Sequence, residues 1–312
     1  MLKQGFTLVE LVTSIVLLSI VFSVVSRIIA MPMAAYSYSL DNLELSDISA
    51  NAMTFLSREI KSAVPNSIRV NGTGTAIEFF PIVAGARYRA VSAPTSLNIL
   101  RFDTTTTSFN LLTPYSLLLP LYATEPYRLV IYNTGAYEYT NGVLDYNQPL
   151  AGLNVYNPEP YTGTNDIPPL NSHVITPDTT TVTFSDGGLS ETMVTLSDDF
   201  QFALESPQQR IYVVNTPVSY ICDTSSGGTT GTLTRFQNYA VTATQPTSAS
   251  DATLTPGTVN QSLLLNHVSS CQFIYDPGTA RRSGIVTFKF SVGSPNGNTA
   301  YFVQQIQVQN AP

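Results

Sequence analysis

Charged side chains are scarce in this 312-residue sequence. They make up 11% of the residues, whereas an ordinary soluble domain carries about twice as much. The 21 acidic residues outnumber the 14 basic ones, so the net charge is −7. No basic cluster occurs, and we therefore expect no nucleic-acid partner. Low charge combined with many Thr, Ser, Asn, Tyr, Gly and Pro residues predicts an exported, β-rich protein with long polar loops.

Histidine is nearly absent as well, which argues against a metal or catalytic centre. His173 is expected in a polar loop and His267 at the start of a strand, and neither has a Cys, His or Glu neighbour at zinc-site spacing. No Gly-x-Ser-x-Gly motif supports a Ser–His–Asp centre. Asp186 and the pair Asp198–Asp199 could offer oxygen ligands to calcium, but solvated turn residues are the simpler interpretation. We expect no catalytic residue, no cofactor and no metal, and hence no enzyme.

The longest apolar run lies at the N-terminus. A short polar leader ends at Gly5, and Phe6 opens a run whose only charge before Arg27 is Glu10. A helix over residues 6–30 would be about 37 Å long, enough to span a hydrocarbon core of about 30 Å. Two interpretations compete: a secretory signal peptide, or a retained membrane helix with a processed leader.

Glu10 favours the retained helix. A carboxylate costs about 2.5–3.5 kcal/mol at the centre of a membrane on insertion scales, so its presence normally has a purpose. A signal peptide has no use for such a charge, and residues 28–33 match a small-x-small cleavage site poorly.

The segment GFTLVE at residues 5–10 resembles the prepilin signature of type IV pilins and type II secretion pseudopilins. The resemblance implies that prepilin peptidase cuts after Gly5 and that the new N-terminal residue, Phe6, is N-methylated. It also implies that Glu10 is an assembly contact, which pairs with the N-terminal ammonium of a neighbouring subunit in a low-dielectric helix bundle.

An amphipathic stripe continues beyond the apolar run. Apolar residues recur at three- and four-residue steps over residues 45–63, and Pro65 ends the pattern. The pattern predicts one helix over residues 6–64, roughly 88 Å long. Pro32 lies inside this helix, so we expect a kink or local melting there; two separate helices are the alternative.

After residue 66 the pattern changes to short runs rich in Val, Ile, Tyr, Phe and Thr. The predicted strands are 67–70, 75–83, 97–102, 127–133, 180–184, 210–215, 218–222, 235–242, 268–275, 284–292 and 299–309. Residues 293–298 are expected to form a hairpin loop. The fold class is therefore α+β, with a long N-terminal α-helix packed on a β-sheet-rich, pilin-like head. The expected domains are a leader (1–5), a transmembrane half-helix (6–35), a periplasmic half-helix (36–64) and the head (66–312).

The only two cysteines, Cys222 and Cys271, fall on strand-like segments. If the head is periplasmic, a disulfide between them is permitted. It would close a span of 49 residues (271 − 222) and stabilise the fold by roughly 4 kcal/mol in the loop-entropy model. Two free buried thiols are the alternative.

Five further segments carry a closer resemblance: FLSREIKSAVPNSIRV (55–70), RIYVVNTPVSY (210–220), CQFIYDPG (271–278), RRSGIV (281–286) and QVQNAP (307–312). They resemble the large minor pseudopilins of the J type and, among them, the O-type minor pilin of the mannose-sensitive haemagglutinin (MSHA) pilus. The resemblance implies a minor subunit that helps to initiate and assemble a pilus. Because the extreme tip subunit of secretion systems typically lacks the assembly glutamate, Glu10 implies a position just below the tip.

The resemblance also implies partners and a location. The partners would be other minor pilins or pseudopilins, the major pilin, prepilin peptidase and an inner-membrane assembly platform. The chain would cross the bacterial inner membrane once, hold its head in the periplasm, and enter a pilus or pseudopilus. The alternatives are a type II secretion minor pseudopilin, or a pilin-anchored adhesin whose head binds a surface ligand, for which tyrosines between residues 115 and 161 could form an adhesive surface.

Overall fold

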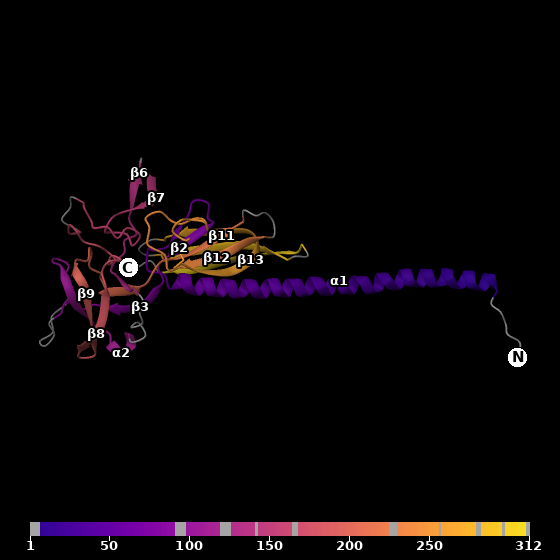
Figure 1. Ribbon diagram of the computed structural model, residues 1–312, viewed down its shortest axis with the longest axis horizontal. Helices are drawn as coiled ribbons and strands as arrows, with labels where there is room; N and C mark the ends of the chain where they lie inside the picture. Colours follow the sequence, from indigo (N-terminus) through magenta and orange to yellow (C-terminus); the bar gives the residue numbers. More distant parts are fainter. Residues whose placement is uncertain are drawn as a thin grey trace.

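The protein consists of a long helical stem and an elongated, strand-rich head (Figure 1). The computed structural model describes residues 7–90, 98–118, 126–140, 143–163, 168–224, 230–255, 257–278, 282–294 and 297–309. Its stem helix, α1 (Leu8–Lys61), projects away from the head over its first part and lies along a sheet over its second part. The predicted α+β fold class is confirmed.

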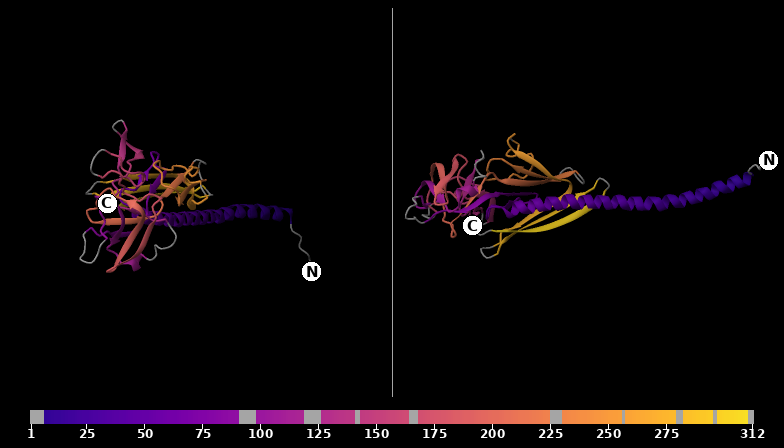
Figure 2. Two further views of the ribbon diagram at one scale, coloured as in Figure 1. Left: turned by 60° about the vertical axis from the view of Figure 1, so that its left-hand side comes forward. Right: turned by 90° about the horizontal axis from the view of Figure 1, so that it is seen from below.

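The stem is one continuous helix of 54 residues, about 81 Å long. Pro32 lies inside it, and the backbone stays helical on both sides, curving gently without a break (Figure 2). The alternative of two helices is therefore wrong, and so is the expected local melting. The helix ends three residues earlier than predicted because residues 62–64 pair with residues 80–82: the N–H of Ile82 donates to Ser62 O at 2.7 Å, and that of Val64 to Phe80 O at 2.8 Å.

A seven-stranded antiparallel sheet covers the second half of the stem. Its strands, in spatial order, are β1 (Arg69–Val70), β2 (Ala76–Phe79), β11 (Val218–Asp223), β12 (Gly231–Gln237), β13 (Asn260–Asp276), β14 (Gly284–Gly293) and β15 (Thr299–Val308). The apolar stripe of α1, including Leu45, Leu56 and Ile60, packs into a core with strand residues such as Phe288 and Ile306. Within this layer α1 lies mainly against β15. The stripe predicted from the sequence is therefore the buried face of the stem.

A second lobe lies beyond the C-terminal end of α1 (Figure 1). Its strands are β3 (Ile82–Arg87), β10 (Arg210–Val214) and β5 (Arg128–Val130) in one sheet, and β4 (Thr106–Leu111), β9 (Glu191–Phe200) and β8 (Val182–Gly188) in another. A hairpin of β6 (Tyr137–Thr140) and β7 (Val143–Pro149) and a single helical turn, α2 (Tyr115–Leu118), complete it. Its core contains buried aromatic residues such as Tyr88, Phe109 and Phe202.

Most of the predicted strands are confirmed, including those in the middle of the chain that correspond to β5, β8, β10 and β11. The prediction of 235–242 was displaced, because β12 begins at Gly231 and ends at Gln237. Residues 75–83 form two strands that belong to different sheets, because residues 80–82 pair with residues 62–64 rather than continuing β2. The described residues 98–102 are not a strand, and β4, β6, β7 and β9 were missed. Strand β13 begins at Asn260, eight residues before the predicted start. His267 consequently lies inside β13, at φ 55, where the register of the β12–β13 pairing shifts.

Candidate functional site

The N-terminal end of the stem carries the candidate assembly residue, Glu10. Thr7 is the N-cap of α1: the Glu10 N–H donates to Thr7 Oγ1 at 3.3 Å, and the Thr7 N–H donates to Glu10 Oε2 at 3.4 Å. This reciprocal pair is a capping box, which satisfies two backbone donors at the helix end. The Glu10 side chain is otherwise exposed. The predicted cleavage residues, Gly5 and Phe6, lie outside the described residues.

The part of the stem that follows is apolar and uncovered. Leu8–Ile29 is long and apolar enough to cross a membrane, and none of its residues is buried against the head. Side chains such as Leu17, Phe22 and Ile28 are 63–75% exposed. An apolar surface of this extent fits surroundings of lipid or of other helices. In such surroundings the Glu10 carboxylate would be costly to leave without a cation or a hydrogen-bond donor.

The far end of the stem is joined to the head through Glu59. Arg235 on β12 donates from Nε to Glu59 Oε2 and from Nη2 to Glu59 Oε1, each at 2.9 Å. The Tyr220 hydroxyl on β11 donates to the same carboxylate. Burial, reinforced by the charge of Glu59, raises the pKa of Tyr220 well above its usual value, so the tyrosine keeps the proton that it donates. The bidentate geometry fixes the last turns of α1 against the sheet.

A second polar contact joins the middle of the stem to the turn between β14 and β15. Asp41 Oδ2 accepts from Ser294 Oγ at 3.0 Å and from Asn298 Nδ2 at 3.2 Å. The segment of α1 between Asp41 and Glu59 is 18 residues, about 27 Å, and is thus held at both ends. The head therefore has a defined position along the stem.

Cys222 on β11 and Cys271 on β13 form a disulfide, with their Cα atoms 6.4 Å apart. Strand β12, which lies between β11 and β13, pairs with β13 only as far as the couple Gly231–Val268. Beyond Val268, β13 has no pairing with β12, and the disulfide links it directly to β11. In the same part of β13, the Phe273 N–H donates to Gly74 O at 2.7 Å. The bridge thus holds the second half of β13 to the rest of the sheet.

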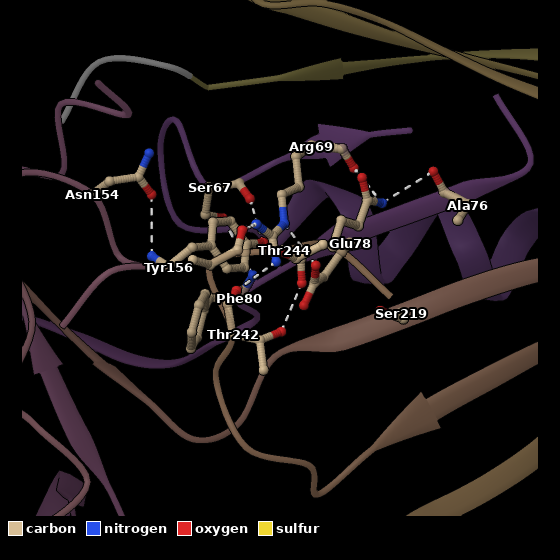
Figure 3. A network of polar contacts seen from close by, with 12 residues as sticks. Ser67, Arg69, Ala76, Glu78, Phe80, Asn154, Tyr156, Ser219, Thr242 and Thr244 are labelled. Carbon is tan, nitrogen blue, oxygen red and sulfur yellow. Dashed lines mark hydrogen bonds and ion pairs between the residues drawn. The ribbon is translucent and has the colours of Figure 1, made fainter. Parts of the chain in front are cut away.

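A buried ion pair joins the neighbouring strands β1 and β2 (Figure 3). Arg69 on β1 donates from Nε to Glu78 Oε2 on β2 at 2.7 Å and from Nη2 to Thr242 O at 2.9 Å. Its guanidinium lies 3.6 Å from the ring centre of Tyr156, and the Tyr239 hydroxyl donates to Glu78 Oε1 at 3.0 Å. Both charged side chains are almost completely inaccessible. The network fastens the segment after β12 to β1 and β2.

A cleft of about 810 Å³ opens above this network, between β1, the β6–β7 hairpin and the second half of β13. Its lining includes Tyr137, Tyr139 and Tyr275 together with Ile274 and Gln272. Tyr139 is 72% exposed, whereas Tyr156, from the same tyrosine-rich stretch, is buried in the core. Among the described tyrosines of this stretch, Tyr137 and Tyr139 therefore line the cleft, whereas Tyr156 belongs to the core.

The histidines and acidic turns have structural surroundings. His173 lies outside the named strands and helices, as expected for a loop, but it is half-buried: its Nδ1 donates to Pro158 O at 2.8 Å and its ring stacks on Phe200. Asp186 accepts from the Gly188 N–H in the β8–β9 turn, and Asp198 accepts from a neighbouring serine. Within the described part of the chain, no three His, Cys, Asp or Glu residues come together as a metal site.

The contacts of Asp41, Glu59 and Glu78 were not anticipated from the sequence. A usable signal did exist, because Arg69 and Arg235 stand inside otherwise uncharged β-type runs of a charge-poor chain. An arginine in such a strand needs an acidic or carbonyl partner when the strand is buried. The sequence does not indicate which acidic residue supplies it, since that depends on strand register.

Comparison with known proteins gives a match at the N-terminal end of the chain only. Residues 1–26 match a family model described as the prokaryotic N-terminal methylation motif. The match supports a type IV pilin-like protein and, with the uncovered apolar helix, fits a membrane-anchored one. No curated protein and no solved structure matches the chain.

Proposed function

We propose that this chain is a minor type IV pilin or pseudopilin, similar to the O-type minor pilin of the MSHA system. It takes part in initiating and assembling a pilus, at or just below the tip. The observation that carries the proposal is the stem: a methylation motif leads into an uncovered apolar helix whose single early charge is Glu10. The role is structural rather than enzymatic.

The stem begins its function by being processed. Prepilin peptidase cuts between Gly5 and Phe6, and Phe6 becomes the methylated N-terminus. The segment 6–35 then holds the chain in the inner membrane, with 36–64 and the head 66–312 in the periplasm. During assembly the apolar helix leaves the lipid for a bundle of like helices, which replaces one apolar environment by another at little cost in hydrophobic free energy.

Glu10 exchanges its contacts when this bundle forms. In the isolated chain its carboxylate accepts hydrogen bonds from Thr7, a neutral residue of its own helix. In the bundle it pairs with the N-terminal ammonium of an adjacent subunit, and a charged donor forms a stronger hydrogen bond than a neutral one. The partners are other minor pilins or pseudopilins and the major pilin, guided by the inner-membrane platform.

The size of the head supports a minor role. Residues 66–312 amount to about 250 residues, which is bulky for a subunit repeated along a filament. Glu10 is present, which supports a place beneath the tip rather than the tip itself.

The test separates processing, capping and assembly by three single substitutions. Gly5→Ala should leave unprocessed precursor in the membrane. Glu10→Ala should be cleaved normally but lose incorporation into complexes with other minor pilins. Thr7→Ala is the matched control, because it removes the hydroxyl of the capping box and keeps the carboxylate. Equal defects in Thr7→Ala and Glu10→Ala would mean that Glu10 only caps its own helix, and unchanged co-purification of Glu10→Ala would contradict charge pairing.

An adhesin is the second candidate, favoured by the tyrosine-lined cleft. Tyr139 is exposed, and the polar residue Gln272 belongs to the same lining, a combination that suits a glycan or a peptide. Imaging of cells that lack the chain separates the two roles. Absent filaments support assembly, whereas normal filaments that no longer adhere support the adhesin. A secretion defect without a change in surface filaments would favour a type II secretion pseudopilin.

A further inference from the structure

The seven-stranded sheet ends at β15, a long and regular edge strand. All ten of its residues pair with β14, with no shift of register from Gly293–Thr299 to Gly284–Val308. No strand of the described residues pairs with its other edge. The opposite end of the sheet, β1, has only two residues. The sheet therefore offers one extended backbone edge.

The register shows which residues of β15 present hydrogen-bonding groups at this edge. The Phe273 N–H donates to Gly74 O, so it points away from β14. Phe273 lies opposite Phe288, which in turn lies opposite Gln304. Because bonded and non-bonded pairs alternate in antiparallel ladders, Phe288 and Gln304 exchange hydrogen bonds. The N–H and C=O groups at the open edge then belong to Tyr301, Val303, Gln305 and Gln307.

This edge lacks several of the features that usually prevent strand addition. Natural edge strands carry charges, proline or bulges, or they are very short. Residues 299–308 read TAYFVQQIQV, with no charge and no proline, and the pairing contains no bulge. Tyr301 is 63% exposed and Val303 51% exposed. An edge of this kind binds another strand readily.

The direction of β15 restricts what can add to it. The strand starts beside Asn298, which binds Asp41 in the middle of α1, and runs toward the end of the stem, in the same sense as α1 (Figure 2). Every ladder of this sheet is antiparallel. An antiparallel addition therefore requires a strand that runs toward the membrane end of the stem. In a second copy anchored the same way, β15 runs parallel to the first β15, away from the membrane end, and therefore does not meet this requirement.

We propose that the outer edge of β15 accepts an extended strand from a different stem-anchored subunit. The strand runs antiparallel to β15 and carries apolar side chains opposite Tyr301 and Val303. This inference rests on the proposed function. On the stem, near the Asp41 that binds Asn298, the apolar side chains of Leu40, Leu43 and Ile48 are 37–65% exposed.

Gln305→Pro tests the proposal with little damage to the head. Its N–H faces the open edge, so proline removes one donor and adds bulk there while every bond to β14 remains. Gln305→Thr is the matched control, since it changes the side chain and retains the N–H. In cells that make the chain natively, Gln305→Pro should reduce incorporation into sheared filaments and detergent-extracted complexes by at least about tenfold. Gln305→Thr should be incorporated normally.

Hydrogen exchange of the full chain gives a second measurement that does not depend on the variant. In the purified chain in detergent, amides 301, 303, 305 and 307 should exchange fast and amides 302, 304 and 306 slowly. In the assembled complex all seven should be slow. Thermal melting of Gln305→Pro shows whether its head is intact.

Normal incorporation of Gln305→Pro, or fast odd-numbered amides in the assembly, would overturn strand addition and leave the proposed function standing. Wild-type chain absent from filaments and complexes would instead overturn the proposed function. Self-association of the purified chain, abolished by Gln305→Pro, would show that a second copy occupies the edge and would overturn the assignment to a different subunit.

Discussion

Replacing Arg69 by methionine should strongly destabilise the head. Glu78 is fully buried, and Arg69 is 3% exposed. Methionine preserves the apolar stem of the side chain but removes the charge and the donors to Glu78 and Thr242. The Glu78 carboxylate would keep the Tyr239 hydroxyl as a partner, without a counter-charge. Breaking one side of a buried ion pair costs about 3–5 kcal/mol, so we expect a loss of that size at pH 7.

The loss should depend on pH in a defined sense. Burial already raises the pKa of Glu78, and the charge of Arg69 opposes that rise. Without Arg69 the folded-state pKa rises further, so the folded state binds a proton that the unfolded state releases. Stability contributed by that proton is present at low pH and is lost as the pH rises through the folded-state pKa. Lowering the pH from 7 to 5 should therefore recover up to about 2.7 kcal/mol, at about 1.36 kcal/mol per unit.

Urea unfolding of the full chain in detergent, at several pH values, measures both effects. Arg69→Met/Glu78→Leu should be more stable than Arg69→Met and should show no pH-dependent recovery, because no carboxylate remains. Arg101→Met is the surface control: Arg101 and Asp103 are both more than half exposed, and the midpoint should not move. A small, pH-independent loss in Arg69→Met would refute the reasoning.

Three further outcomes are expected. Arg235→Ala removes the bidentate partner of Glu59 and should cost about 1–3 kcal/mol in urea unfolding, whereas an unchanged midpoint would mean that apolar packing alone holds the stem. Cys222→Ala/Cys271→Ala should lose up to about 4 kcal/mol and become insensitive to reductant, unlike the parent chain. Burial lowers the pKa of His173, so the unfolded state binds its proton first and stability should fall as the pH drops below about 6.5. His173→Asn should flatten this pH dependence, and an unaltered slope would contradict it.

The stem was predictable because its periodicity is local. An apolar stripe with a 3.6-residue period identifies a helix from neighbouring residues alone. Its end was misplaced because Ser62 and Val64 bond to a segment about eighteen residues later, a tertiary contact that overrides helix preference. The missed strands have the same cause. The stretch at β9 reads as polar, and its strand exists because β4 and β8 pair on both sides of it.

The candidate sites also differ in whether they depend on local sequence or on tertiary contacts. Residues 5–10 form a compact motif, so Glu10 could be singled out without any knowledge of the fold. The pair Arg69–Glu78 depends on the two residues facing each other across β1 and β2, and Glu59–Arg235 joins positions 176 residues apart. Spacing in the sequence carries no information about such partners. The scarcity of charge indicated that Arg69 and Arg235 have acidic partners, but the strand register determines which acidic residues these are.

The continuous stem has a mechanical consequence for the search for partners. From Leu8 to Asp41, which binds the head, the helix is a rod of 33 residues, about 50 Å long, and the side chains described along it are exposed up to Leu40. At a common membrane tilt of about 20° the near end of the head is displaced sideways by roughly 17 Å. A flexible tether would leave the head free to tumble, whereas a rod restricts it to precession and spin about the stem axis. For the proposed membrane-anchored chain, encounter between two such molecules would be confined to two dimensions, and the rotation of the helix in the bilayer would decide which side of the head meets its neighbour.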